Sequence, residues 1–313
     1  MRNPRTALVT GAGGFIGWPI AAALARKGVR VVALDLAEPE DQLTGCDIEI
    51  GSFVDKAFVE RLFERYGFDT VVHTGGISGP MLARDNPYLI CTTNVLGTIN
   101  LLEMARQTGV ERFVHCGSAY AFGNTPPAPV PDDAPLRATD VYGSTKGASD
   151  LILRAYRTQH GLDAVSMRIS NGFGPRRRTR CAVRLMLENA LDGKPTHLEW
   201  GGGYGRAYLY VEDAVTALEA AVHAPEIGQW AYNVAGPDFV TMQVVADIVQ
   251  RIIPGARITM DDGVDTLGYR REALDITAAG RDLGWTPQFG IERAVTAYRD
   301  WIVGQRKAKG ATQ

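Results

Sequence analysis

The sequence predicts an α/β protein with a doubly wound parallel sheet and a smaller C-terminal lobe. Three observations predict this fold. In the first half, short β-branched runs alternate with longer helical stretches, and the runs are apolar throughout, as in strands covered on both faces. A glycine-rich turn joins the first strand to the first helix. Near residue 170 the alternation stops, and 313 residues suffice for two domains.

The elements of the first half follow one another in order. Each strand is a short apolar run, and each helix repeats apolar residues at helical spacing. We expect strands at 6–10, 29–34, 70–73, 112–116 and 164–168. We expect helices at 16–27, 54–66, 94–108 and 144–160.

The second half is less regular and, up to residue 206, rich in Gly, Arg and Pro. We expect a helix at 182–192, a strand at 208–211, a helix at 212–223, short elements from 225 to 290 and a last helix at 291–303. Residues 1–171 are assigned to the sheet domain, to which 207–223 returns. The substrate lobe takes 172–206 and 224–306, and the polar tail 307–313 is expected to be flexible.

Composition excludes several classes of protein. With 33 basic and 35 acidic residues the net charge is −2, which argues against a nucleic-acid partner. No apolar run reaches the roughly 20 residues that span a bilayer, and no apolar leader precedes the first strand, so we expect a cytoplasmic protein. The four cysteines and five histidines lack metal-ligand spacing, so no metal is expected. Glycine is unusually frequent, at 35 residues.

Three of these glycines form a nucleotide-binding pattern. Gly11, Gly14 and Gly17 stand between a strand and a helix, where glycine allows a tight turn and close approach of a pyrophosphate. The helix N-terminus then presents N–H groups to the phosphates. Asp35 ends the second strand, where a carboxylate would bind the ribose hydroxyls of NAD and repel the extra phosphate of NADP. NAD is therefore the expected cofactor.

A candidate catalytic group lies further along the chain. Tyr142 and Lys146 are four residues apart and share one face of a helix, so the Lys146 cation can favour the phenolate form of Tyr142. A phenolate can act as a base near neutral pH. Ser118 follows a strand end, where its hydroxyl could bond a substrate oxygen.

These motifs together resemble the extended short-chain dehydrogenases/reductases of the NAD-dependent epimerase/dehydratase group. The resemblance covers nearly the whole chain and includes the glycine motif, Tyr142-x-x-x-Lys146 and Tyr210-Val211-x-Asp213. It implies a Rossmann domain that binds NAD, a homodimer formed through helices 94–108 and 144–160, and Ser118, Tyr142 and Lys146 as the catalytic trio. Besides the trio and the motif, it implies cofactor contacts from Phe15, Ile16, Thr74, Gly75, Gly76 and Asn94.

The chain departs from the family pattern in two places beside the cofactor. Gly51-Ser52 stands where Gly-Asp is usual, and Thr74-Gly75-Gly76 stands where Leu-Ala-Ala is usual. The extra glycine could admit a bulkier or differently placed ligand, or it could be neutral.

Substrate residues are expected in the lobe and at its border. The resemblance implies that Asn171 and Arg206 hold a nucleotide diphosphate, with Arg270 and Arg271 near a second such position. Guanidinium groups suit phosphate, but internal salt bridges are the alternative role. The run 176–180 holds four arginines that either face an anionic substrate or form a solvated loop.

The chemistry that the resemblance implies is oxidation of a secondary alcohol of a sugar or nucleotide sugar. A nucleotide-sugar epimerase is the leading hypothesis, and an NAD-dependent dehydrogenase of a small sugar, sugar acid or polyol is the alternative. A 4,6-dehydratase is disfavoured, since that subfamily has an Asp-Glu pair at the positions that Ala119 and Tyr120 occupy in this chain. Ala119 is nevertheless expected to contact the substrate, because it follows Ser118. A non-catalytic NAD-sensing protein is a third hypothesis, against which the intact trio argues.

Overall fold

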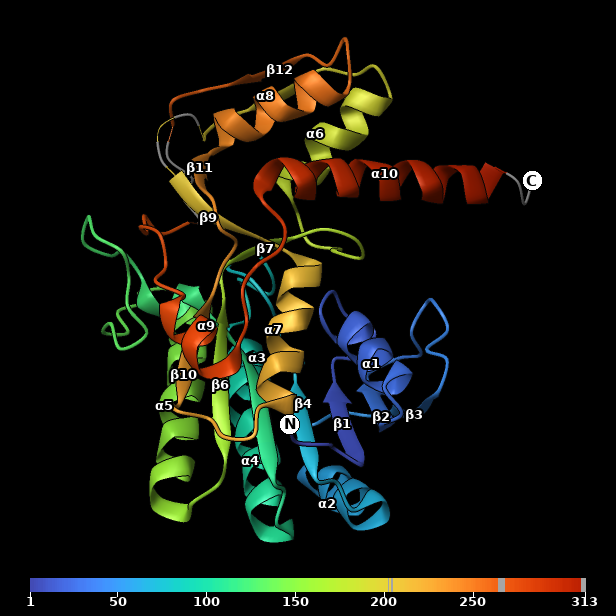
Figure 1. Ribbon diagram of the computed structural model, residues 1–313, viewed down its shortest axis with the longest axis vertical. Helices are drawn as coiled ribbons and strands as arrows, with labels where there is room; N and C mark the ends of the chain where they lie inside the picture. The colour runs from blue at the N-terminus through green and yellow to red at the C-terminus, as the bar shows by residue number, and fades with distance from the viewer. Residues whose placement is uncertain (202, 204, 264–267, 311–313) are drawn as a thin grey trace.

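The computed structural model describes residues 1–201, 203, 205–263 and 268–310 (Figure 1). Its main sheet has seven strands, in the order β10-β6-β5-β4-β1-β2-β3, and every neighbouring pair is parallel. The strands are β1 (Thr6–Thr10), β2 (Arg30–Asp35), β3 (Cys46–Ile50), β4 (Thr70–His73), β5 (Arg112–Ser118), β6 (Ala164–Ile169) and β10 (Ala231–Val234). The predicted doubly wound parallel sheet is confirmed.

The direction of winding reverses at β1. The chain passes from β1 to β2 and β3 on one side and then returns to β4 on the other side of β1. In open sheets of this kind ligands bind outside the carboxyl ends of the strands at such a switch point. The fold therefore places a site at the ends of β1 and β4.

Helices cover both faces of the sheet. On one face α1 (Gly17–Arg26) and α7 (Val211–His223) form one apolar core with alternate residues of the strands, such as Val9 and Val31. On the other face α2 (Lys56–Tyr66), α4 (Gly97–Thr108) and α5 (Val141–His160) form a second core with Leu8 and Val32. The alternation of side chains along a strand produces this division.

The lobe lies beyond the carboxyl ends of the strands, at the top of Figure 1. A third apolar core, which includes Phe173, Tyr210 and Tyr298, holds it together. Its helices are α6 (Ala182–Leu191), α8 (Met242–Ile252) and α10 (Ile291–Gly310). Its strands are β7 (Asn171–Phe173), β9 (Gly205–Tyr210) and β11 (Phe239–Thr241) in one sheet, and β8 (Thr196–Leu198) and β12 (Ile258–Met260) in another.

Several elements differ from expectation. β10 falls in the segment 224–306 that was assigned to the lobe, yet it pairs with β6, because its four buried residues complete the edge of the main sheet. α9 (Thr277–Leu283) likewise packs Ala279 into the α1 core. α8 replaces part of the stretch expected to hold only short elements. Of the segment 207–223 that was assigned to the sheet domain, α7 packs on the main sheet, whereas the residues of β9 pair with β7 and β11 of the lobe. The domain boundaries themselves stay a prediction.

The C-terminal end also differs. α10 continues to residue 310, so residues 307–310 of the expected flexible tail are helical, while 311–313 lie outside the described residues. Across the described chain, no helix combines the length and apolar character needed to cross a bilayer.

Candidate active site

The turn between β1 and α1 is packed too closely for side chains at Gly11, Gly14 and Gly17. Gly11 has a φ of 64°, and a Cβ on it would lie 2.6 Å from the Cα of Gly75. A Cβ on Gly17 would lie 1.9 Å from the carbonyl oxygen of Gly11. Bare backbone is thus presented at the ends of β1 and β4, in front of the N-terminus of α1. This arrangement can cradle a pyrophosphate.

We call the turn formed by residues 11–17 the cradle, and local contacts place its other residues. The Gly14 N–H donates to the Gly11 carbonyl at 2.9 Å, and Ile16 is the N-cap residue of α1. Phe15 faces the border of the lobe, since a Cβ on Gly172 would lie 3.1 Å from its ring.

The carboxylate of Asp35 is held at the same turn. One oxygen accepts from the Gly13 N–H at 2.8 Å, and the other accepts from the Leu36 N–H at 2.7 Å. These bonds fix an acidic group at the carboxyl end of β2, where the hydroxyls of an adenosine ribose could reach it.

The glycines after β4 do not open extra space. The Thr74 hydroxyl donates to the Thr10 carbonyl at 2.7 Å. A Cβ on Gly75 would lie 2.6 Å from the Phe53 ring, and a Cβ on Gly76 would lie 2.9 Å from Oδ1 of Asn94. Protein atoms already fill the room that glycine leaves. The structure therefore gives no support to the idea that these glycines admit a bulkier ligand.

Asn94 anchors the loop that follows β4. It lies in a π-helical turn, Thr92–Leu96, a feature often found at functional sites. Its Oδ1 accepts from the Ile77 N–H at 2.8 Å, and its Nδ2 donates to the Ile77 carbonyl and to Oγ1 of Thr145. Asn94 thereby ties the cofactor side of the site to α5.

The residues of the predicted trio lie on two elements that pack together, Ser118 at the end of β5 and Tyr142 and Lys146 on α5. Tyr142 and Lys146 are 6% and 8% exposed, and Nζ of Lys146 donates to the Cys116 carbonyl at 2.9 Å, near the end of β5. Ser118 ends that strand, and its Oγ accepts from the Tyr120 N–H at 3.2 Å. Because this oxygen accepts a bond, its own proton can point to a substrate oxygen.

Two histidines are buried near Lys146. His73 bonds to Oγ1 of Thr10 at 2.7 Å and to Oγ1 of Thr98 at 3.0 Å, and its ring lies 5.3 Å from that of His115. Burial, reinforced by the positive charge of Lys146, lowers the pKa of His73 to about 3 and that of His115 well below its usual value. Both are therefore neutral at physiological pH. Among the described residues, no group of three or more potential ligands could hold a metal ion.

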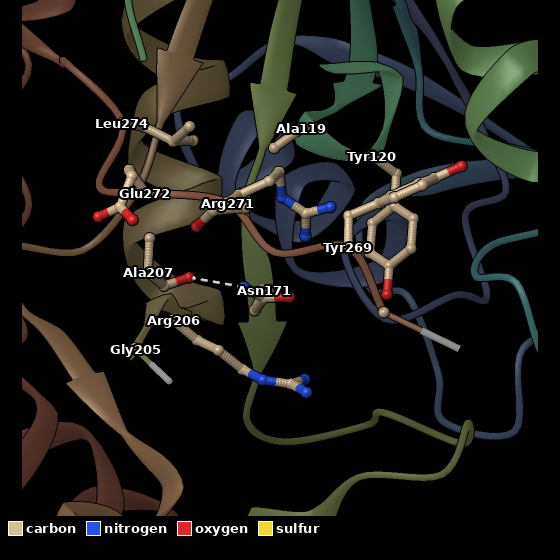
Figure 2. Close-up of a pocket in the computed structure, with 12 residues that line it drawn as sticks. Ala119, Tyr120, Asn171, Gly205, Arg206, Ala207, Tyr269, Arg271, Glu272 and Leu274 are labelled. Carbon is tan, nitrogen blue, oxygen red and sulfur yellow. Dashed lines mark hydrogen bonds between the residues drawn. The ribbon is translucent and has the colours of Figure 1, made fainter. Parts of the chain in front are cut away.

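A hollow opens beside the trio, where the lobe meets the sheet domain (Figure 2). Its lining includes Ala119, Asn171, Arg206 and Arg271 of the predicted substrate residues. In Figure 2 Arg206 and Arg271 both extend toward the side on which Tyr120 and Tyr269 lie, whereas the carboxylate of Glu272 points away from them. Ser118, Tyr142 and Lys146 do not line the hollow.

Tyr120 links the hollow to the trio. Its ring lies edge-on to that of Tyr142 at 5.5 Å, and Cζ of Arg271 lies 4.4 Å from its centre on the hollow side. Burial, with a further effect of Arg206, lowers the pKa of Arg271 from its usual value. Sequence reasoning missed the roles of Tyr120 and of Tyr269, which also lines the hollow. The only local signal was that Tyr120 follows Ser118 closely.

The other predicted substrate residues have different surroundings. Nδ2 of Asn171 donates to the Ala207 carbonyl at 3.1 Å, and the Arg206 guanidinium stacks on Trp200 at 4.7 Å. Arg270 is exposed and is not among the lining residues. Of the adjacent pair of arginines, the structure brings only Arg271 to the hollow.

The arginine run 176–180 pairs with acidic residues of the sheet domain. Arg176 stacks on Trp18 at 3.6 Å and forms an ion pair of 2.6 Å with Asp41, while Arg178 pairs with Glu40 at 3.1 Å. We call these five residues the clasp.

The clasp borders the Asp35 end of the cradle. The loop that carries Glu40 and Asp41 follows Asp35 and folds back on the cradle, since a Cβ on Gly13 would lie 3.6 Å from Cα of Pro39. Arg176 and Arg178 thus contact protein carboxylates at this end of the site, and neither lines the substrate hollow.

Comparison with known proteins assigns the family. The model of the NAD dependent epimerase/dehydratase family matches residues 7–235, which is most of the chain. The chain belongs to this family. It is therefore an NAD-dependent enzyme of the extended short-chain dehydrogenase/reductase type, and the resemblance drawn from its motifs is confirmed.

Relatives in this family carry out more than one reaction. UDP-glucose 4-epimerase of Mycolicibacterium smegmatis is 31% identical, over 94% of this chain and 98% of the relative. dTDP-glucose 4,6-dehydratase of Salmonella typhimurium is 28% identical, over 95% and 92%. Among solved structures, UDP-glucose 4-epimerase of Thermus thermophilus in complex with NAD is 29% identical, with a TM-score of 0.84 over 94% of this chain and 98% of that one.

The cradle fits NAD, the cofactor of this family. Glycine is required where backbones approach closely at Gly11 and Gly17, and Asp35 is fixed where a ribose would lie. Tyr142 and Lys146 lie at the other side of the switch point, beyond β4. These residues would hold the cofactor and the substrate side by side.

Proposed function

We propose that the protein is a nucleotide-sugar epimerase, which oxidises a secondary hydroxyl to a ketone and reduces the ketone again on its other face. One observation carries the proposal: Asn171, Arg206 and Arg271 border one hollow, a single aromatic ring away from Tyr142. Guanidinium groups at this distance from the base suit a diphosphate attached to the sugar. The relatives named above, which are enzymes of UDP-glucose and dTDP-glucose, agree with a nucleotide-sugar substrate.

The residues of the trio have separate roles in this proposal. Tyr142 takes the proton of the substrate hydroxyl and returns it when the ketone is reduced. Lys146 supplies a fixed positive charge beside Tyr142, and Ser118 donates a hydrogen bond to the substrate oxygen. The glycine turn and Asp35 would hold NAD, which would supply the reversible transfer of a hydride from and to the substrate carbon.

A dehydratase would need a further acid and base near the sugar. The residues after Ser118 are Ala119 and Tyr120, neither of which is a carboxylic acid. Glu272 lines the hollow but turns its carboxylate away from the two arginines (Figure 2). The site therefore favours epimerisation over dehydration.

The alternative is an NAD-dependent dehydrogenase of a small sugar, sugar acid or polyol without a nucleotide. The position of Arg270 favours this alternative, because it is exposed and does not line the hollow, which leaves one guanidinium fewer for a diphosphate than the sequence predicts. In this case Arg271 would hold a carboxylate of a smaller substrate.

One experiment separates the two reactions. The pure enzyme is incubated with NAD and with a panel of UDP-glucose, dTDP-glucose, free sugars, sugar acids and polyols. Interconversion of a nucleotide sugar without net NADH supports the epimerase. Build-up of NADH in proportion to the oxidised product contradicts it and supports the dehydrogenase.

We also propose that the enzyme is a cytoplasmic homodimer. The outer side of α3 (Pro87–Cys91), the π-helical turn and α5 exposes apolar side chains, among them Tyr88 at 78% and Leu151 at 53%. A second copy packed against the same face would cover them.

A further inference from the structure

One segment of the lobe lines the hollow and contacts the sheet domain. We call residues 268–274 the pocket strap. Its backbone follows the loop after β5: the Thr125 N–H donates to the Arg270 carbonyl at 3.1 Å, and the Arg270 N–H donates to Oδ1 of Asn124 at 2.9 Å. At Leu274 it forms a β-bridge with Val130. The strap is thus fixed to the domain that carries the trio.

Tyr269 of the strap is bonded to the N-terminus of α5. Its hydroxyl accepts from the N–H groups of Thr139 at 2.6 Å and Asp140 at 2.8 Å, and it donates to the Asp140 carboxylate. Asp140 is the N-cap of α5 and accepts from the Gly143 N–H at 2.9 Å. The hydroxyl of Tyr269 is therefore fully engaged two residues before Tyr142.

The strap also places a charged group in the hollow. Cζ of Arg271 lies 4.4 Å from the Tyr120 ring and 5.9 Å from the Tyr269 ring (Figure 2). Its Nη1 is buried and has no hydrogen-bond partner in the described part of the chain. The Tyr120 ring contacts both Tyr269, at 5.6 Å, and Tyr142, at 5.5 Å. A bound anion at Arg271 would complete this arrangement.

We propose that Tyr269 is a positioning residue for Tyr142, and that it couples the binding of an anionic substrate group at Arg271 to the placement of the catalytic helix. The proposal rests on the proposed function, in which Arg271 receives the anionic group of the substrate. Arg271 and Tyr269 are two residues apart on one strap, so an anion that holds Arg271 in place also holds the Tyr269 hydroxyl on α5.

The position of the helix end decides the geometry of the base. Tyr142 lies in the first turn of α5, and a first turn depends on its cap for its N–H groups. Displacement of a catalytic group by about 1 Å can reduce the rate by about 100-fold. Loss of the Tyr269 hydroxyl removes its bonds to Asp140 but retains Asp140 as the cap of α5, so we expect a smaller reduction of the rate.

The first test is Tyr269→Phe, which removes the hydroxyl and retains the ring that contacts Tyr120 and Arg271. We expect kcat to fall about tenfold. KM for whichever sugar proves to be the substrate should change less than about twofold, because the Tyr269 hydroxyl bonds to the N-terminus of α5 and not to the substrate. Tyr66→Phe is the matched control, since it also removes a hydroxyl bonded to a carboxylate, that of Glu49 at 2.5 Å, and lies outside the site.

The outcomes are distinct. A raised KM with unchanged kcat would mean that the Tyr269 hydroxyl binds the substrate, and it would overturn the positioning role. Wild-type values of kcat and KM in Tyr269→Phe would overturn it as well. Asp140→Ser keeps a capping oxygen and removes the carboxylate that Tyr269 bonds. In that background Tyr269→Phe should cause a smaller further loss of kcat than in the wild type. Full loss in both backgrounds would contradict action through Asp140.

A second test needs no turnover and uses UDP as the probe. Amide hydrogen exchange is followed in the pocket strap and in the first turn of α5. We expect UDP to slow exchange in both segments of the wild type, but only in the strap of Tyr269→Phe. Equal slowing of α5 in both proteins, or no effect of UDP on the strap, would overturn the coupling. Failure of the proposed function is recognised by a different result: Tyr142→Phe would then retain turnover, whatever hydrogen exchange shows for the strap and α5.

Discussion

Replacement of Arg176 by asparagine tests whether the clasp retains the cofactor. Arg176 has a φ of 67°, in the left-handed region that asparagine tolerates better than most residues. Arg176→Asn therefore removes the guanidinium with little change in backbone preference. The loop that it releases, with Asp41, borders the Asp35 end of the cradle.

The expected change in the rate of NADH release follows from the two contacts that Arg176→Asn removes. Stacking on Trp18 at 3.6 Å is worth about 0.5–1 kcal/mol at an exposed site. The ion pair with Asp41, whose side chain is 63% exposed, adds about 0.2–1 kcal/mol. A total near 1 kcal/mol corresponds to about fivefold in a rate constant, since about 1.4 kcal/mol is tenfold. We therefore expect NADH to leave the variant about five times faster.

Release is measured by loading the enzyme with NADH, adding an excess of NAD and following the loss of bound NADH fluorescence. Salt should accelerate release from the wild type more than from the variant, because it screens the exposed ion pairs. Lys56→Gln is the control, since it removes an exposed ion pair of 3.6 Å with Glu60 on α2. Release from Arg176→Asn at the wild-type rate would refute the role of the clasp.

Four further predictions follow from the site and the surface. Tyr142→Phe should leave NAD binding nearly intact and reduce turnover by about 100-fold or more, as checked by titration and kcat. Asp35→Ala should lower the ratio of kcat/KM for NAD over NADP; an unchanged ratio would contradict its ribose contact. Leu151→Asp, which places a charge at an exposed position of α5, should dissociate the proposed dimer in sedimentation analysis. Since the pKa of His73 is about 3 when folded and 6.5 when unfolded, only the unfolded form gains a proton below pH 6.5. His73 alone should therefore lower the free energy of unfolding by about 1.4 kcal/mol per pH unit from there toward pH 3, and His115, whose pKa burial lowers in the same direction, should steepen this fall, as urea titrations would show.

The sequence was sufficient wherever the chemistry is local. The glycine turn depends on backbone close to Gly11 and Gly17, and its pattern lies within seven residues. The pair Tyr142 and Lys146 depends on the pitch of one helix. Strand ends at Asp35 and Ser118 were visible because apolar runs stop there.

The rest depends on contacts that no local pattern records. Tyr269 reaches Asp140 across 129 positions of the chain, and nothing near Tyr269 indicates this partner. The same holds for β10, whose short apolar run is compatible with either sheet until its pairing with β6 is seen. Of the adjacent Arg270 and Arg271, only the backbone direction of the strap decides which one faces the hollow.

The lobe contacts the sheet domain near both ends of the candidate site, and this bears on the type of reaction. The clasp lies at the Asp35 end of the cradle, and the pocket strap lies at the end of the hollow beside Tyr142. An epimerase restores NAD within each turnover and gains from retaining it, whereas a dehydrogenase must release NADH every time. If the clasp retains the cofactor, NADH release from the wild type should be slower than turnover. Release faster than turnover would favour the dehydrogenase, whatever the sugar proves to be.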